Sequence, residues 1–410
     1  MEKYLKLFEY HSQYEDFVSG GTMVKPNVSH CVQENEVHYN PKYNHDYTKD
    51  YFTIESLEDS NTIYLKASRT LEIKTVSAST DNGETWTEYK SSKDGSGTTL
   101  ATLNTGDKLL VKGENTEYGS SAGFNQFKST KQFEVNGNIM SLISGDSFAN
   151  ADELTGTYTF KSLYNGCTGL TSAENLALPA TTLANYCCRE MFNGCTSLTT
   201  APSVLPATTL ANYCYYQMFK NCTSLTIAPE LPATTLASNC YQEMFNGCTS
   251  LTTAPELSAT SLTTNCYSNM FYGCTNLTVA PELPAATLAS NCYDGMFRGC
   301  TSLTTAPELP ATTLASYCYR SMFYGCTSLT TAPELPVETL AEGCYNSMFS
   351  NCTNLNYIKC LATASATDST TNWVSGVAST GIFVKNSAAT WDVTGVDGIP
   401  TGWAVQDATA

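Results

Sequence analysis

The sequence predicts an α/β solenoid, with one helix and one short parallel strand in each repeat of about 26 residues, preceded by a small all-β, sandwich-like domain. Three observations support this prediction. A Cys-Thr step recurs eight times, at spacings of 28, 27 and then five times 26 residues. Apolar residues inside each copy recur every four positions. Residues 51–147 instead alternate short β-prone runs with turn signals.

Four segments of the chain differ in composition and pattern. Residues 1–50 are polar and tyrosine-rich and are predicted to be an N-terminal anchoring or docking segment. Residues 51–147 are the predicted β domain, and the repeats fill residues 148–356. Residues 357–410 break the repeat pattern. Because a solenoid needs an atypical unit to cover its open end, this last segment is predicted to be a C-terminal cap.

The N-terminal segment contains all four histidines of the chain: His11, His30, His38 and His45. A short helix over residues 12–18 and either two short strands or a β-arm over residues 27–40 are expected there. A zinc site that includes Cys31 is an alternative, but the spacing fits no ligand pattern, so surface histidines are preferred. No run is apolar enough for a signal peptide or a membrane span, which predicts a soluble chain that is not exported by that route.

Seven segments of the β domain are expected to be strands: residues 51–57, 61–67, 71–78, 85–90, 107–113, 131–137 and 138–143. One turn among them resembles the Asp-box of sialidase propellers, through Ser79, Asp81, Gly83, Thr85 and Trp86. In those enzymes the motif recurs as a structural hairpin away from the chemistry, and here it occurs once. We therefore interpret it as a hairpin in which Asp81 caps the turn, Gly83 adopts positive φ and Trp86 packs beneath.

The repeat unit is exemplified by residues 231–256, LPATTLASNCYQEMFNGCTSLTTAPE. Apolar side chains recur every four residues in it, which indicates an amphipathic helix: Leu236, Cys240, Met244 and Cys248. Thr235 is the expected N-cap, and Thr339 with Glu342 matches a capping box in a later copy.

The predicted helix ends at a position that is always Gly or Asn, the residues that tolerate left-handed backbone: Gly166, Gly194, Asn221, Gly247, Gly273, Gly299, Gly325 and Asn351. The following CTSLTTAPEL is expected to be extended, with Leu251, Ala254 and Leu257 directed inward as a short parallel strand.

Fifteen of the 18 cysteines occupy two positions of the repeat that lie eight residues apart. On a helix this separation is roughly 12 Å, too long for a disulfide within one unit. Since Cys packs as a small hydrophobe, we predict buried free thiols, with disulfides between neighbouring repeats as the alternative. The predicted core comprises Met244 and Phe245 with their equivalents, and Cys187, Cys195, Cys214, Cys222, Cys240, Cys248, Cys266, Cys274, Cys292, Cys300, Cys318, Cys326, Cys344 and Cys352.

The run Phe245-x-x-Cys248-x-x-Leu251 resembles the hallmark of the BspA-like class of bacterial leucine-rich repeats. It recurs eight times over about half of the chain, with Tyr164 in place of the phenylalanine in the first, partial unit. This resemblance implies that the predicted α/β solenoid is a leucine-rich-repeat solenoid.

The arrangement of segments also resembles that of surface or virion proteins of gut Bacteroidales and their phages, and the opening of about forty residues is similar to openings of structural proteins of crAss-like phages. The resemblance implies a phage fibre, appendage or decoration protein at the virion surface, whose N-terminus docks to other virion proteins. Its partners would be a host cell-surface protein or glycan and further copies of the chain, as in trimeric fibres. A structural spacer and a bacterial cell-surface adhesin are the alternatives.

Charge and motifs argue against several other functions. The net charge of -17 disfavours a nucleic-acid binder, which needs a basic face. No P-loop, dinucleotide or nucleophile-elbow motif occurs, and no catalytic residue, metal or cofactor is expected. A non-enzymatic binding protein is the leading hypothesis.

The apolar and turn positions barely change among the copies, whereas a few positions of the predicted helix change freely. A variable recognition surface rich in Tyr, Asn, Ser and Arg is one interpretation, and relaxed selection on solvated positions is the other. The candidate recognition residues are Arg189, Glu190, Asn193, Tyr216, Gln217, Lys220, Gln242, Glu243, Asn246, Ser268, Asn269, Tyr272, Asp294, Gly295, Arg298, Arg320, Ser321, Tyr324, Asn346, Ser347 and Ser350.

A second face of the repeats offers two further features. Thr252 and Thr253, with their equivalents, form a flatter alternative recognition surface. An acidic ladder is expected beside them, at Glu230, Glu256, Glu282, Glu308 and Glu334. Like charges about 5 Å apart repel, so the carboxylates are expected to fan into water, with bridging cations as the alternative.

Overall fold

The computed structural model describes residues 45–68, 73–92, 96–364, 368–391 and 393–409. Contacts divide the chain into two compact units, residues 1–47 and 48–410, and the second unit is described below. Three of the four histidines, the helix expected over residues 12–18 and the strands or β-arm expected over residues 27–40 lie outside the described residues. In the described ranges no helix has the length and apolarity needed to cross a membrane.

Two antiparallel arrangements of strands build the β domain. The strands are β1 (Phe52–Ser56), β2 (Asn61–Ala67), β3 (Thr75–Ser79), β4 (Thr87–Lys90), β5 (Thr98–Leu103), β6 (Lys108–Lys112), β7 (Asn125–Ser129) and β8 (Phe133–Asn138). One sheet has the order β8-β1-β6-β3-β4, and the other has the order β5-β2-β7. Strand β2 alternates buried and half-buried residues along its whole length, as expected for a sheet with one face on the core.

Six of the seven segments expected to be strands contain a strand, and one does not. Residues 138–143 instead lead into α3 (Ser141–Ser144), the only α-helix among the described residues, which is followed by the 3-10 helix η5 (Gly145–Asn150). Another 3-10 helix, η4 (Tyr47–Lys49), precedes β1. Strands β5 and β7 were not expected. In β7, NQFKS, Phe127 is the only apolar residue, so no alternation is visible in the sequence.

The hairpin interpretation of the Asp-box is confirmed. The Asp81 carboxylate accepts hydrogen bonds from the Thr85 backbone N–H at 2.9 Å and from the Ser79 hydroxyl at 2.6 Å. These bonds, with one from the Thr85 hydroxyl, hold the pKa of Asp81 down at about 2. Gly83 has φ +88°, and a Cβ placed on it would lie 3.5 Å from the Trp86 ring. The turn joins β3 to β4.

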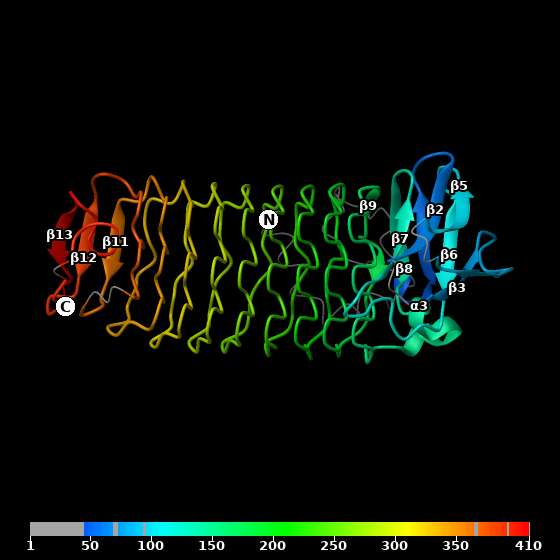
Figure 1. The fold of residues 1–410 in the computed structure, drawn as a ribbon, viewed down its shortest axis with the longest axis horizontal. Coiled ribbons are helices and arrows are strands. Elements are labelled where there is room, and N and C mark those ends of the chain that lie inside the picture. Colours follow the sequence, from blue (N-terminus) through cyan, green and yellow to red (C-terminus); the bar gives the residue numbers. More distant parts are fainter. Residues whose placement is uncertain (1–44, 69–72, 93–95, 365–367, 392, 410) are drawn as a thin grey trace, which may run out of the picture. The chain divides into compact units, whose positions relative to one another are not determined.

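The prediction of a helix in each repeat is wrong. In an α-helix every N–H bonds to the carbonyl four residues earlier. In the repeat that contains Met244, the N–H groups instead alternate between two partners. The Met244 N–H bonds to the carbonyl three residues earlier, at 3.2 Å, whereas the Phe245 N–H bonds to the Met270 carbonyl of the next repeat, at 2.9 Å. The segment is a chain of tight turns that is hydrogen-bonded to the next repeat. Each repeat forms one coil of the stack (Figure 1).

Every fourth residue of these turns has a left-handed backbone. In one coil the three positions are Asn239, Glu243 and Gly247, with φ of 59°, 55° and 77°. The third is the Gly/Asn position, and the expected positive φ is confirmed in all eight copies. A left-handed conformation costs a non-glycine residue about 1–2 kcal/mol. Hydrogen bonds between coils and the burial of the residues between these positions offset that cost.

The strict spacing of four residues explains the error. A helix has 3.6 residues per turn. Side chains that recur strictly every four residues therefore shift around the helix axis by about 40° at each step and do not stay on one face. Between Leu236 and Cys248 the apolar residues recur as adjacent pairs every four residues, which a helix would carry gradually around its axis. Thr235 is therefore not a helix N-cap, and Thr339 with Glu342 is not a capping box. The solenoid consists of turns and extended segments, with no helix in any described repeat.

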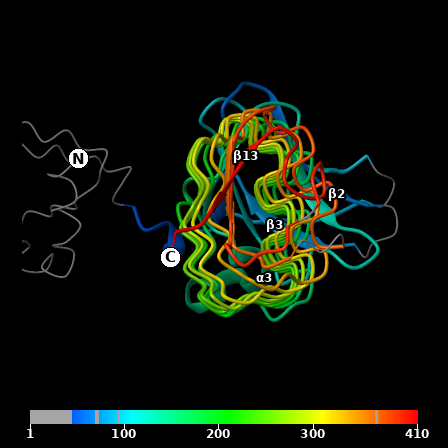
Figure 2. The same cartoon turned by 90° about the vertical axis from the view of Figure 1, so that its left-hand side faces the viewer.

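The extended part of each repeat is shorter than a strand in most coils. The first repeat forms β9 (Leu170–Ser172) and β10 (Leu176–Ala177), and later repeats are joined by isolated parallel bridges such as Ile227 to Thr253 and Val279 to Thr305. Leu251 and Leu257 are buried, as expected, and Ala254 is half-buried. Viewed along the stack, the coils superpose on one another (Figure 2).

The core consists of side chains stacked in columns. Phe245 lies between Phe219 and Phe271, with ring centroids 5.7 Å from each, and the buried tyrosines beginning at Tyr215 form a parallel column. All 17 described cysteines are free and buried. The prediction of buried free thiols is therefore confirmed for these residues; Cys31 lies outside the described range.

Both ends of the stack are covered by sheets. At the start, β8 pairs in parallel with β9 and β10, so the sheet of the β domain continues into the first repeat. At the other end, β11 (Tyr357–Cys360), β12 (Ile382–Lys385) and β13 (Ala404–Asp407) form a parallel sheet. Trp373 is fully buried against Tyr345 and Phe349 there.

Candidate functional site

The variable positions of the repeats form three columns on the coils, which we call the variable face. Along the turns, backbone N–H groups bond to the carbonyl of the residue that precedes their equivalent in the next coil, so each column places one residue per coil beside its equivalent in the next. The columns are Arg189, Tyr216, Gln242, Ser268, Asp294, Arg320 and Asn346; Glu190, Gln217, Glu243, Asn269, Gly295, Ser321 and Ser347; and Asn193, Lys220, Asn246, Tyr272, Arg298, Tyr324 and Ser350.

The middle column stands on the left-handed positions. Its seven residues have φ between 53° and 60°. Most residues of the three columns are half-buried, Tyr272 is exposed, and Ser268, Asp294, Gly295 and Ser350 are buried. The structure therefore brings the candidate recognition residues together on the tight turns of successive coils, and not on a helix as predicted.

Polar side chains of neighbouring coils bond to one another in the first half of the variable face. Glu243 forms an ion pair with Lys220 at 2.5 Å and accepts a hydrogen bond from the Gln217 amide at 2.9 Å. Arg189 pairs with Glu190 at 2.8 Å and lies over the Tyr216 ring, 4.8 Å from its centroid. Burial and the Glu243 charge raise the pKa of Tyr216 to about 12. These contacts fix the side chains in place before any ligand arrives.

The second half of the variable face has its own cluster. The Arg320 guanidinium donates to both carboxylate oxygens of Asp294, at 3.0 and 2.5 Å. This pairing raises the pKa of Arg320 above its ordinary value. The next column holds Arg298 between two tyrosines, with its guanidinium carbon 5.6 Å from the Tyr272 ring centroid and 4.3 Å from that of Tyr324.

A fourth column beside the variable face was not anticipated. It lies at the first left-handed position of each coil and starts with Tyr158, Tyr186 and Tyr213, whose rings stack at 5.0 and 4.9 Å. Tyr317 occupies the same column further along and donates a hydrogen bond to Glu342. The signal was present in the sequence, because from Tyr186 to Gly343 this position changes among Tyr, Asn and Gly in the copies while the Cys that follows it stays constant.

The threonine face is built differently from the variable face. Thr252 and Thr253 are exposed, and the Thr252 hydroxyl donates to the Thr226 carbonyl of the preceding coil at 3.2 Å. The five glutamates of the acidic ladder are exposed, and Glu334 pairs with Lys359 at 2.9 Å. In the described ranges no three His, Cys, Asp or Glu residues are grouped so that they could hold a metal ion.

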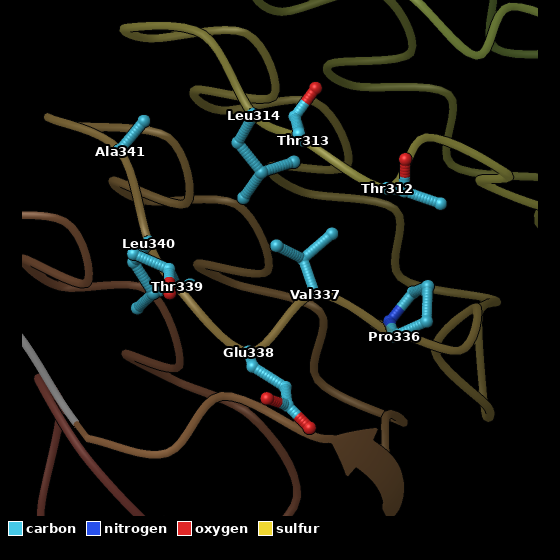
Figure 3. Close-up of a pocket in the computed structure, with 9 residues that line it drawn as sticks. All are labelled: Thr312, Thr313, Leu314, Pro336, Val337, Glu338, Thr339, Leu340 and Ala341. Atoms are coloured by element: carbon cyan, nitrogen blue, oxygen red, sulfur yellow. The ribbon is translucent and has the colours of Figure 1, made fainter.

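Two hollows lie outside the variable face. One, of about 550 Å³, lies between two coils and is lined by residues 312–314 and 336–341, with Glu338 as its only charged side chain (Figure 3). The other, of about 310 Å³, lies in the β domain beside Lys112 and Asp146, which form an ion pair at 2.7 Å. Lys112 also lies over the Trp86 ring, 4.2 Å from its centroid, so these groups already bind one another.

The buried thiols of the coils and the polar groups at their surface differ in chemistry. Burial raises the pKa of the thiols, to about 12 for Cys248 and Cys300, which keeps them protonated and weakly nucleophilic. The polar groups that reach the surface of the variable face are amides, hydroxyls, carboxylates, guanidinium groups and tyrosine rings. Groups of these kinds are able to form hydrogen bonds and stacking contacts.

Comparisons with known proteins identify the family to which the repeats belong. A family described as "BspA type Leucine rich repeat region" matches in six copies over residues 161–287 and 268–370. A leucine rich cell surface protein from Faecalibacterium prausnitzii A2-165 is 15% identical, with 61% of this chain and 76% of that chain covered and a TM-score of 0.28. A leucine-rich repeat protein from Bacteroides ovatus ATCC 8483 is 14% identical, with 60% and 77% covered and a TM-score of 0.29. No curated protein matches the chain.

Proposed function

The chain belongs to the BspA-type leucine-rich repeat family, and from this premise we propose that it is a non-enzymatic binding protein whose variable face recognises a molecule displayed on a cell surface. One observation supports the proposal above all. The copies keep their core and turn residues and differ at positions that the coils bring together on one face. A constant scaffold with a variable, tyrosine-rich and amide-rich surface is the composition of known paratopes.

The rigidity of the face supports the same proposal. Each coil is hydrogen-bonded to the next along the turns that carry the three columns. Ion pairs such as Lys220 with Glu243 and Arg320 with Asp294 hold side chains in one arrangement. A pre-organised surface loses little conformational entropy when a ligand binds, which raises affinity.

We further propose that the chain is a virion fibre or appendage protein whose N-terminal segment docks to other virion proteins. The support is the resemblance of the first forty or so residues to openings of phage structural proteins, and these residues lie outside the described range. The ligand would then be a host surface protein or glycan. On a bacterial surface the same variable face would serve as an adhesin, and a decoration or spacer role needs no ligand at all.

The binding proposal is tested by exchanging residues between coils. In a triple variant, Tyr216→Ser, Gln217→Asn and Lys220→Asn, each new residue already occurs in the same column of another coil, at Ser268, Asn269 and Asn193 or Asn246. Such a variant loses the contacts of Lys220 and Gln217 to Glu243, so its melting temperature should fall modestly while the chain remains folded, and it should bind host cells at least tenfold more weakly in a cell-binding assay. The matched control is Thr252→Ser with Thr253→Ser on the threonine face. A control that loses binding while the triple variant keeps it would assign recognition to the threonine face.

The location is tested by labelling purified particles and host cell envelopes with antibody against the chain. Label on particles supports the virion proposal, and label only on cell envelopes contradicts it. Deletion of the repeats then separates the roles. Intact particles that no longer adsorb indicate receptor binding, and failed assembly indicates a structural part.

A further inference from the structure

Arg298 occupies an unusual place on the variable face. Tyr272, Arg298 and Tyr324 are the residues of one column in three successive coils. The guanidinium carbon lies 5.6 Å from one ring centroid and 4.3 Å from the other, so the cation is held between the two tyrosines. The 26-residue repeat itself creates this arrangement, because it stacks the three positions directly along the solenoid.

The other basic residues of the three columns are neutralised within the chain. Arg189 pairs with Glu190, Lys220 with Glu243, and Arg320 with Asp294. Over the described ranges, Arg298 makes no ion pair and no hydrogen bond to a carboxylate.

The acid closest in sequence to Arg298 is already engaged. Asp294 binds Arg320 through both of its carboxylate oxygens. Arg298 is therefore the one cation of the three columns whose charge no described carboxylate balances.

Stacking prepares a guanidinium for one kind of ligand. A guanidinium that stacks on an aromatic ring keeps its N–H donors in its own plane, where they match the two oxygens of a carboxylate. The Asn351 side-chain amide donates to the Tyr324 hydroxyl at 2.8 Å. That bond uses the acceptor side of the hydroxyl and leaves its own proton available to a ligand. The cluster thus presents a fixed cation and an adjacent hydroxyl donor.

We propose that Arg298, held between Tyr272 and Tyr324, binds the carboxylate of an acidic sugar on an otherwise neutral glycan. This inference rests on the proposed binding function and names the ligand class of the same face. The net charge of -17 repels polyanions and acidic proteins, whereas an isolated carboxylate meets a local unbalanced cation. Asn269 and Ser321, half-buried in the adjoining middle column, supply amide and hydroxyl groups suited to the sugar hydroxyls.

The test compares Arg298→Gln with the control Lys90→Gln, which removes the same charge from a cation that lies in the β domain, outside the variable face, and is already paired with Glu88. The probes are glycans ending in glucuronic or N-acetylneuraminic acid, the same glycans without the acidic sugar, and a glutamate-rich peptide, titrated in physiological salt. We expect the wild-type chain to prefer the acidic glycans. Arg298→Gln should raise their Kd at least tenfold, and Lys90→Gln should leave it within about twofold.

Two further variants separate the stacking from the charge. Arg298→Lys keeps the charge but not the planar fork, and Tyr324→Leu removes one stacking ring, so each should weaken acidic-glycan binding. Unchanged melting temperatures show that the coils remain folded. Equal affinity for acidic and neutral glycans, unaltered binding by Arg298→Gln, or binding of the peptide alone would overturn this inference. If the triple variant described above still loses cell binding, the proposed function stands while this inference fails.

Discussion

The Cys248 thiol donates a hydrogen bond, 3.0 Å long, to the backbone carbonyl of Phe219 in the preceding coil. The same bond recurs from Cys195 to Cys352, at 2.9 to 3.2 Å, in every coil of that column. The cysteine thus does two things at once. It fills a buried position of small volume, and it joins one coil to the next through a carbonyl of the aromatic position.

Loss of this thiol should destabilise the stack. Cys248→Ala removes a fully buried sulfur and its hydrogen bond, so we expect the free energy of unfolding to fall by about 1–3 kcal/mol. Cys248→Ser retains a donor and should cost less than the alanine variant. Urea denaturation followed by circular dichroism measures both, and Thr249→Ala, at an exposed neighbour, is the control. Equal losses for serine and alanine would show that the hydrogen bond contributes nothing.

Stability should fall steeply at alkaline pH. Burial raises the pKa of Cys248, Cys300 and Cys352 from an ordinary value of 9.0 to about 12, so the folded chain keeps protons that the unfolded chain releases. Their contribution is complete below pH 9 and is lost as the pH rises from 9 toward 12. Urea midpoints should stay level up to about pH 8 and decrease progressively from pH 9 to pH 11. Removing one such thiol should reduce the slope by about 1.4 kcal/mol per pH unit, and an unchanged slope would contradict this account.

The left-handed positions should respond to substitution in the opposite way to a helix. Ser321 has φ +53°, so Ser321→Gly should stabilise the chain or leave it unchanged. Gly325 has φ +73°, and a Cβ added there meets no atom closer than 3.9 Å, so Gly325→Ala tests backbone strain alone. We expect it to cost about 1–2 kcal/mol in thermal or urea unfolding. In a helix both signs would be reversed, with glycine costing about 1 kcal/mol relative to alanine.

The ion pair between Arg320 and Asp294 should be worth more than a surface pair. Its carboxylate is only 11% exposed, and the arginine is 43% exposed. A double-mutant cycle with Arg320→Gln and Asp294→Asn should give a coupling energy of about 1–2 kcal/mol. The pair Lys90 with Glu88, whose side chains are 66% and 63% exposed, is the comparison, and its cycle should give almost no coupling. Equal couplings would mean that burial adds nothing.

The C-terminal cap should depend on one tryptophan. Trp373 is fully buried, stacks on Tyr345 at 6.2 Å and donates its indole N–H to the Gly398 carbonyl at 2.8 Å. Trp373→Ala should cost about 3–5 kcal/mol and expose the last coil, giving aggregation visible by light scattering. Trp373→Phe keeps the ring and should lose clearly less. Wild-type behaviour of the alanine variant would show that the cap is dispensable.

The repeat sequence by itself determined the solenoid, its period, the buried cysteines and the left-handed Gly or Asn that follows each Met-Phe pair. These features are periodic and local, so spacing and residue type reveal them. The helix was wrong because a spacing of four is compatible with both a helix and a chain of turns when only side chains are considered. The choice depends on where the backbone N–H groups find their partners, and here half of them find partners one whole coil away, as with Phe245 and Met270.

Tertiary structure alone decided three further features. The continuation of β8 into β9 and β10 makes the β domain the cover of the first coil, which no local pattern indicates because the paired residues are tens of positions apart. The tyrosine column at Tyr186 and Tyr213 joins the variable face only because the coils stack. Likewise, Arg298 meets Tyr272 and Tyr324 across spacings of one full repeat. The sequence determined which positions vary, and the stacking of coils determined which of them meet.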